Sequence, residues 1–174
     1  MKKKILGGIL LSMCIFSCAS ISVRANSLSG ITPTSGVDEL IPLEIQEYAN
    51  IIGNEKNICP ELLEAIAWTE SRCQAEAKNG PCKGLMQVST ACHKDRFYDE
   101  GWTPDDWTDA YINMYVAADY LRELFDDYED VAMVLYAYNG DSTNMEKYKK
   151  NGYLSYYVSS ILDLSEKLER AHGK

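Results

Sequence analysis

The chain has 174 residues, of which 46% are hydrophobic and 25% are charged, and its formal net charge is −9. This excess of acidic residues disfavours nucleic acid as a partner, because binding to a phosphate backbone relies on Lys and Arg. About 130 residues follow an N-terminal segment of different composition, which is enough for one hydrophobic core and one cleft.

The N-terminal segment has the features of an export signal. Three lysines precede a long apolar run, and Ala25 ends a small-residue cleavage motif, so residues 1–25 are predicted to be a secretory signal peptide. An uncleaved membrane anchor is the alternative, and Cys18 offers a poor lipidation site. Removal of this segment, which holds four basic residues and no acid, changes the net charge from −9 to −13. The mature protein is therefore expected to be secreted or associated with the cell envelope.

Residues 26–42 are rich in Ser, Thr, Gly and Pro and predict a flexible linker. Residues 43–174 predict a single, mainly α-helical domain, because their apolar residues recur at helical spacing and no strand pattern competes. The predicted helices cover residues 43–52, 60–71, 84–92, 109–127, 131–138 and 153–170.

Glu70 is the candidate catalytic acid. It closes the predicted helix 60–71 and lies at helical spacing from the apolar residues Leu63, Ile66 and Ala67. A carboxyl group held against apolar neighbours has a raised pKa and can donate a proton near neutral pH. Glu61 and Glu64 are expected to be solvated, and an exposed surface acid is the ordinary interpretation of any single helical Glu.

Gly84-Leu85-Met86-Gln87 follows a loop over 78–83 and is a candidate cleft wall. Gly84 would allow the backbone to approach a ligand, and Gln87 could hydrogen-bond sugar hydroxyls or N-acetyl groups. Met86 would supply an apolar wall. The alternative is a glycine turn followed by a short amphipathic helix.

Tyr138 and Asn139 end the predicted helix 131–138, just before Gly140, a helix stop signal. Tyr138 could hydrogen-bond the catalytic acid from this position, although a tyrosine is also a common core residue. The aromatic residues Trp102, Trp107 and Tyr111 could stack on sugar rings or belong to the core.

Together these motifs, over about residues 43–162, resemble the catalytic domain of soluble lytic transglycosylases, a family similar to goose-type lysozyme. The resemblance implies a lysozyme-like helical fold with a single active-site cleft that binds peptidoglycan. It implies that Glu70 is the catalytic acid/base, that Ser71 is its usual neighbour, and that Tyr138 contacts the acid. It also implies that Gly84-Leu85-Met86-Gln87 and Asn139 line the glycan cleft.

The reaction that the resemblance implies needs one carboxylate and no cofactor or metal. Glu70 would protonate the leaving oxygen between N-acetylmuramic acid and N-acetylglucosamine, and then accept the proton of the C6 hydroxyl that closes a 1,6-anhydro ring. A hydrolytic muramidase is the alternative, with a second carboxylate from one of Asp95, Asp99, Asp105, Asp106 and Asp109. A second alternative is a protein of the same fold that binds glycan or supports an assembly without catalysis.

Peptidoglycan strands are the expected partner, with the membrane and a secretion or conjugation apparatus as further candidates. Four cysteines of the exported domain predict disulfides. Cys59 and Cys73 flank a helix and are about 20 Å apart, too far to bond. Two of the three possible pairings remain, and we favour Cys73 with Cys82 and Cys59 with Cys92, because these bonds would brace both ends of the motif loop. A zinc site that includes His93 is the alternative.

Overall fold

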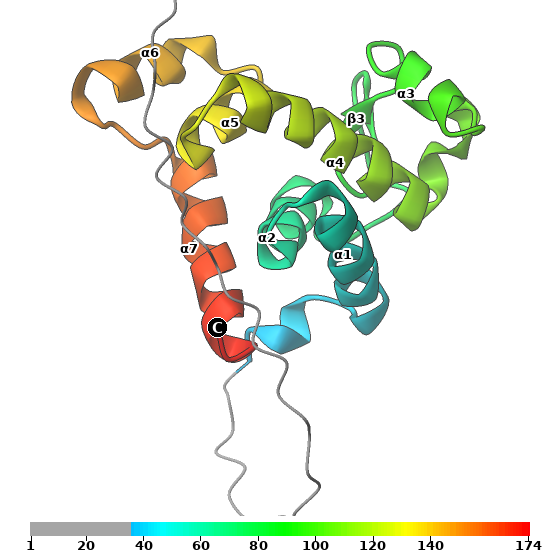
Figure 1. Cartoon of the computed structure of the whole chain (residues 1–174), viewed down its shortest axis with the longest axis horizontal. Coiled ribbons are helices and arrows are strands. Elements are labelled where there is room, and N and C mark those ends of the chain that lie inside the picture. The colour runs from blue at the N-terminus through cyan, green and yellow to red at the C-terminus, as the bar shows by residue number, and fades with distance from the viewer. Residues whose placement is uncertain (1–35) are drawn as a thin grey trace, which may run out of the picture. The chain divides into compact units, whose positions relative to one another are not determined.

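The computed structural model describes residues 36–174, which form mainly α-helices (Figure 1). The predicted signal peptide and residues 26–35 of the predicted linker lie outside the described residues. The chain enters the domain through a short 3-10 helix, η1 (Asp38–Leu40), and the side chain of Ile41 is buried. The end of the predicted linker therefore packs against the domain. Within residues 36–174, no helix is both long enough and apolar enough to span a bilayer.

Helix α2 (Pro60–Ser71) lies at the centre and carries the candidate acid. It packs against α1 (Leu43–Lys56) and α7 (Tyr156–Ala171), which lie on either side of it in Figure 1. Pro60 occupies the first helical position, where its missing N–H costs no hydrogen bond. The apolar face expected for this helix is fully buried and consists of Leu63, Ile66 and Ala67.

Helix α4 (Ala110–Asp127) packs against α1 and α5 (Val131–Tyr138), and α6 (Ser142–Asn151) packs against α5. The side chains of Asp109 and Asp130 cap α4 and α5 by accepting backbone hydrogen bonds at 3.0 and 2.8 Å. These caps fix the starts of two helices that contribute residues to the candidate site.

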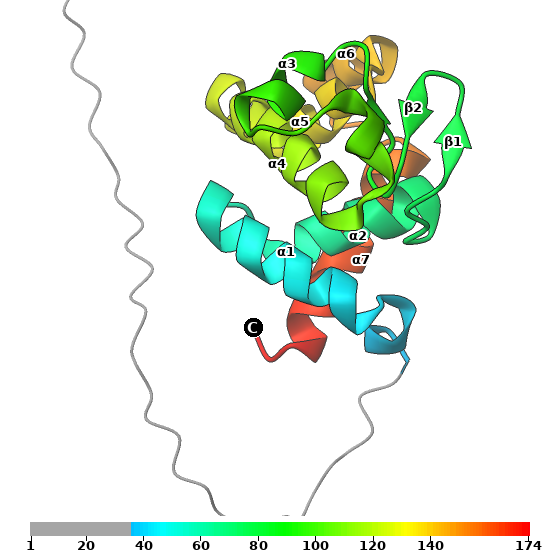
Figure 2. The same cartoon turned by 90° about the vertical axis from the view of Figure 1, so that its right-hand side faces the viewer.

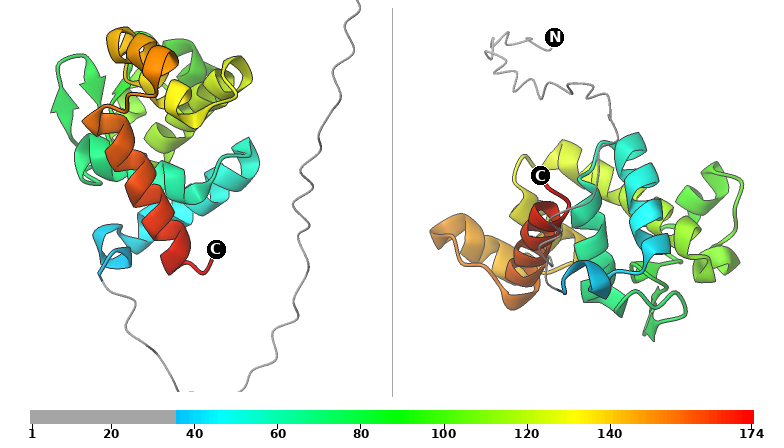
Figure 3. Two further views of the ribbon diagram at one scale, coloured as in Figure 1. Left: turned by 90° about the vertical axis from the view of Figure 1, so that its left-hand side faces the viewer. Right: turned by 90° about the horizontal axis from the view of Figure 1, so that it is seen from below.

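A small antiparallel sheet follows α2, with strand order β1 (Lys78–Asn79), β2 (Cys82–Lys83) and β3 (Val88–Ser89). Figures 2 and 3 show that this sheet lies at the same end of the domain as α6 and the start of α7. Two short helices, α3 (Lys94–Asp99) and η2 (Pro104–Thr108), connect the sheet to α4. The pattern of apolar residues did not indicate these short strands, although the domain is mainly helical, as predicted.

The predicted helix over 84–92 is also wrong, because this segment forms a turn and strand β3. Gly84 and Gln87 have φ values of +81° and +52°, which a right-handed helix does not tolerate. The backbone N–H of Met86 donates to Oδ1 of the buried Asn113 at 2.8 Å, and Asn113 Nδ2 donates to the carbonyl of Lys83 at 3.1 Å. A side chain from α4 thus replaces helical hydrogen bonds here.

Most other helix predictions are confirmed to within a few residues. The ranges of α2 and α5 agree at both ends, α4 begins one residue later than expected, and α1 extends further, to Lys56. Helix α7 begins at Tyr156 rather than at residue 153. Helix α6 was not predicted, because only Met145 of this short polar segment is buried and the apolar period is therefore weak.

The acids Glu61 and Glu64 are buried, which contradicts the expectation that they are solvated. Glu61 accepts hydrogen bonds from Lys174 at 2.9 Å and from the thiol of Cys59 at 3.1 Å, and it lies 2.9 Å from Nδ1 of His172. Burial alone would raise the pKa of Glu61, but these contacts lower it to about 2. Glu61 therefore ties α2 to the end of α7.

Candidate active site

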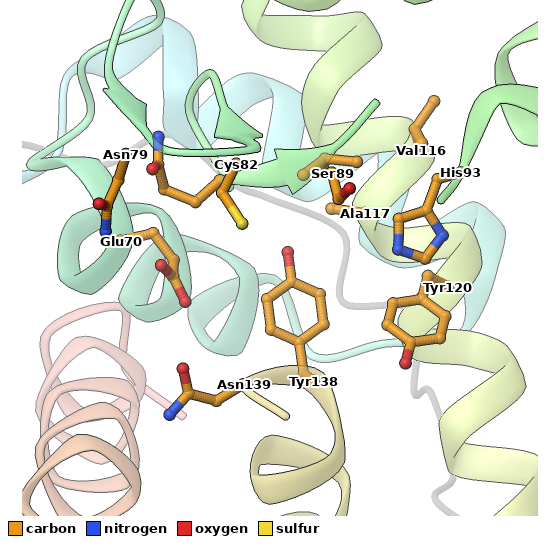
Figure 4. A pocket seen from close by; sticks show the side chains of 12 residues that line it. Glu70, Asn79, Cys82, Ser89, His93, Val116, Ala117, Tyr120, Tyr138 and Asn139 are labelled. Atoms are coloured by element: carbon orange, nitrogen blue, oxygen red, sulfur yellow. The ribbon is translucent and has the colours of Figure 1, made fainter. Parts of the chain in front are cut away.

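Glu70 lies on the last turn of α2 and faces a cavity of about 190 Å³ between the small sheet and helices α4 and α5 (Figure 4). The sheet contributes Asn79, Cys82 and Ser89 to its upper side in Figure 4, and the end of α5 contributes Tyr138 and Asn139 below. The cavity is lined by Glu70, Asn79, Cys82, Gln87, Val88, Ser89, His93, Val116, Ala117, Tyr120, Tyr138 and Asn139.

The carboxyl group of Glu70 is half-buried, and burial raises its pKa. The hydroxyl of Tyr157 donates a hydrogen bond to Oε1 of Glu70 at 2.5 Å, which favours the carboxylate and offsets part of this effect. Burial and the neighbouring charge of Glu70 raise the pKa of Tyr157, so this phenol stays protonated and acts as a donor. Glu70 is thus both shielded from water and held in one orientation.

Tyr138 does not make the predicted hydrogen bond to Glu70. Its hydroxyl donates to the backbone carbonyl of Met86 at 2.8 Å, and its ring lies between Glu70 and Tyr120 in Figure 4. Burial and the charge of Glu70 raise the pKa of Tyr138. Tyr138 therefore lines the cavity and fixes the motif loop, while Tyr157 contacts the acid.

The four residues of the motif Gly84-Leu85-Met86-Gln87 have different roles: three pack inside the domain and one lines the cavity. Leu85 and Met86 are fully buried in the core, so neither forms the expected cleft wall. A Cβ atom on Gly84 would lie 2.2 Å from Nδ2 of Asn113, so the glycine admits Asn113 rather than a ligand. Of the four residues, Gln87 lines the cavity, and its Nε2 donates to the carbonyls of Ala77 and Gly84.

Of the two remaining predicted binding residues, Ser71 is buried and only Asn139 lines the cavity. Ser71 is buried, and its Oγ donates to the carbonyl of Leu85 at 2.7 Å and accepts from the backbone N–H of Gln74 at 3.1 Å. It therefore connects α2 to the motif loop and does not line the cavity. Asn139 lines the cavity with an exposed side chain.

Tyr157 and several cavity residues from the sheet and α4 are not predicted from the sequence. Asn79 precedes the Gly80-Pro81 turn, and an Asn-Gly pair is a hairpin signal that could have placed it. His93 and Tyr120 lie side by side with ring centroids 4.5 Å apart. Burial and the nearby Arg96 lower the pKa of His93, which favours the neutral ring. No local pattern distinguished Tyr157 among the twelve tyrosines.

The two predicted disulfides are absent, and the four cysteines of residues 36–174 are thiols. Cys59 comes directly before α2 and contacts Glu61 and Glu169, whereas Cys92 follows strand β3, and neither forms a disulfide. Cys73 follows α2, and its thiol has a pKa raised to about 11 by burial and the charge of Glu64. The thiol of Cys82 lies in the cavity instead, and burial, Glu70 and Cys92 raise its pKa.

None of the aspartates considered as a second carboxylate lines the cavity. Asp106 accepts hydrogen bonds from Thr103, and Asp109 caps α4. Asp95 and Asp99 line a separate surface hollow. Within residues 36–174, no cluster of three or more His, Cys, Asp and Glu side chains is arranged to hold a metal ion.

The aromatic residues between the motifs pack against one another. The ring of Trp102 meets those of Tyr111 and Tyr115 edge to face at 6.5 and 5.3 Å, and Trp107 is buried. None of them lines the cavity. Trp102, Trp107 and Tyr111 therefore belong to the core and do not stack on sugar rings in this cavity.

Comparison with known proteins agrees with this geometry. The sequence model of the transglycosylase SLT domain matches residues 47–156, a range that includes Glu70, the 84–87 motif, Tyr138 and Asn139 and ends just before Tyr157. The chain matches no curated protein sequence. The match covers more than half of the chain and coincides with its mainly helical domain. The chain therefore belongs to the transglycosylase SLT domain family, whose members are lytic transglycosylases that act on peptidoglycan.

Proposed function

We propose that this protein is a peptidoglycan lytic transglycosylase in which Glu70 is the single acid/base. The observation that carries the proposal is the environment of Glu70. Among the described residues, it is the one Asp or Glu that lines the cavity, and burial raises its pKa. A carboxyl group in this state can give up a proton and later take one back without help from a second acid.

In the first step, the bond between C1 of N-acetylmuramic acid and the glycosidic oxygen breaks, and that oxygen takes the proton of Glu70. The developing positive charge at C1 is met by the carboxylate that remains. In the second step, the C6 hydroxyl of the same sugar attacks C1, and its proton passes to Glu70. The products are a 1,6-anhydro end and a free 4-hydroxyl, and the enzyme returns to its starting state.

Tyr157 supports the first step. Its hydrogen bond to Oε1 stabilises the carboxylate after the first proton transfer and leaves Oε2 available to the sugar. The neutral side chains of Asn79, Gln87 and Asn139 surround the site and offer amide donors and acceptors for hydroxyl and N-acetyl groups.

Hydrolysis is the less favoured alternative. An inverting or retaining glycosidase uses two carboxylates on either side of the bond, and the aspartates proposed for this role have other partners or lie outside the cavity. A glycan-binding protein without turnover would not need a buried acid with a raised pKa.

The test is the Glu70→Gln variant on purified peptidoglycan, with Glu76→Gln, an exposed acid on the following loop, as the matched control. We expect loss of cleavage in the first variant, full activity in the second, and unchanged circular dichroism in both. Mass spectrometry of the wild-type products should give anhydro ends. Reducing ends would identify a hydrolase, and full activity of Glu70→Gln would refute the acid/base role.

Export and the biological process are parts of the same proposal. A muralytic enzyme must reach the cell wall, and residues 1–25 have the pattern of a signal peptide. Cleavage after Ala25 would give a mature chain that begins at Asn26, which N-terminal sequencing of secreted protein can check. The activity would serve wall remodelling or local opening of the wall for a secretion or conjugation apparatus.

A further inference from the structure

Exposed aromatic side chains gather where α6 meets α7. Tyr153, Leu154 and Tyr156 are 48%, 40% and 87% exposed, and they occupy four consecutive positions with Ser155. We define the α6–α7 patch as these three residues together with Lys147 and Lys150. Grouped apolar side chains on a surface mark a binding site more often than scattered ones do.

The backbone that carries these rings is fixed to the core. The hydroxyl of the buried Tyr136 donates to the carbonyl of Tyr153 at 2.9 Å and accepts from the N–H of Ser155 at 2.8 Å. Ser155 then caps α7 by accepting from the N–H of Val158. Tyr153 therefore lies on an ordered loop and Tyr156 on the first turn of α7, and a ligand does not have to order this backbone when it binds.

In the sequence, the patch lies between two residues of the candidate site. Asn139, which lines the cavity, lies shortly before α6, and Tyr157, which contacts Glu70, directly follows Tyr156. Successive helical residues point about 100° apart. Tyr157 therefore points toward the acid, while its neighbour Tyr156 points in another direction and is exposed. Figures 2 and 3 show the start of α7 at the same end of the domain as the sheet that forms the opposite wall.

Helix α6, which carries the two lysines of the patch, has more basic than acidic side chains, unlike the whole protein. Helix α6 contains three lysines and one glutamate, although the whole chain carries a net charge of −9. The glutamate, Glu146, pairs with Lys149 at 2.7 Å. Lys147 lies 5.6 Å from the centroid of the Tyr153 ring, and Lys150 is exposed. The exposed rings thus occur together with positive charge.

We propose that the α6–α7 patch binds the peptidoglycan strand where it leaves the cleft. The tyrosine rings stack on sugar rings, and Lys147 and Lys150 meet the carboxylates of the peptide stems. This inference rests on the proposed function, and it assigns the substrate class as strands that still carry acidic peptide stems. Charge complementarity and continuity with the cleft both favour this occupant.

The test measures binding in the full chain with Glu70→Gln, so that cleavage does not interfere. Sedimentation with purified peptidoglycan gives the affinity for Tyr156→Ala, for the pair Lys147→Gln and Lys150→Gln, and for Tyr98→Ala, an exposed tyrosine on α3 that serves as control. We expect Tyr156→Ala to weaken binding about three- to tenfold. The lysine pair should weaken binding mainly at low salt, and Tyr98→Ala should have no effect.

Two further samples identify the occupant. Peptidoglycan from which an amidase has removed the peptide stems should bind the parent and the lysine variant equally, and vesicles of anionic phospholipid should not bind. Equal binding of parent, Tyr156→Ala and lysine variant to intact peptidoglycan would overturn the inference, as would binding to vesicles alone. Patch-dependent binding by a protein whose wild type cleaves nothing would uphold the inference and refute the proposed function.

Discussion

Replacement of Tyr157 by Phe should move the alkaline limb of the activity profile to higher pH. The phenol donates to the carboxylate of Glu70 at 2.5 Å and so lowers a pKa that burial has raised. A hydrogen bond to a charged group contributes about 1.5–3 kcal/mol, and one pKa unit corresponds to about 1.4 kcal/mol. Because Glu70 is half-buried, the lower value applies and the shift should be about one unit.

The sign follows from the role of the acid. Glu70 must be protonated to start the reaction, so activity falls as pH rises through its pKa, and a variant without the donor keeps its proton to higher pH. The assay is the loss of turbidity of a peptidoglycan suspension between pH 4 and pH 9, together with carbon NMR of the labelled Glu70 carboxyl group. Tyr138→Phe is the control, because its hydroxyl donates to Met86 and its removal should leave the midpoint unchanged. An unmoved or lowered midpoint in Tyr157→Phe would refute this reasoning.

Gly84→Ala should lower the free energy of unfolding in urea by more than about 3 kcal/mol, because the new methyl group would lie 2.2 Å from Asn113 Nδ2. The control Gly80→Ala has no atom within 4 Å of its new methyl group and should lower it by only about 1 kcal/mol. Equal losses would contradict this. Attachment of N-ethylmaleimide to Cys82 should reduce cleavage more than about tenfold by filling the cavity, while Cys82→Ser should stay active and resist the reagent. Inactivation of the serine variant at the same rate would exclude Cys82 as the target. Glu61→Gln should lower the free energy of unfolding by up to about 3 kcal/mol at pH 7, because the folded-state pKa of about 2 stabilises the domain above the unfolded-state pKa. The difference should disappear as pH falls through about 4 to 2, and a difference that persists at pH 2 would show that the charge is not the cause.

The sequence predicts correctly the helices that bury an apolar stripe. It does not predict segments whose backbone conformation depends on polar contacts with distant residues. The ranges of α2 and α5 follow from their apolar period and from Pro60 and Asp130 at their starts. The segment over 84–92 has the composition of a short helix, but Asn113 takes its backbone hydrogen bonds from α4. A contact across nearly thirty residues leaves no trace in a local pattern.

In the candidate site, the residues that local motifs indicate are predicted correctly, whereas a contact between distant helices is not. The apolar neighbours of Glu70 and the motifs of Gln87 and Asn139 predict these three residues, and all three line the cavity. The sequence predicts Tyr138 as the partner of the acid, because this residue ends a helix. The structure gives that contact to Tyr157, since α7 packs along α2 and brings its first turn to the end of α2.

The position of Tyr157 also links distant parts of the domain. Glu70 lies on α2, and its hydrogen-bond donor lies on α7, the last helix of the described residues. The site is therefore complete only when α7 packs against α2, so a change that loosens this packing anywhere along α7 also reaches the acid.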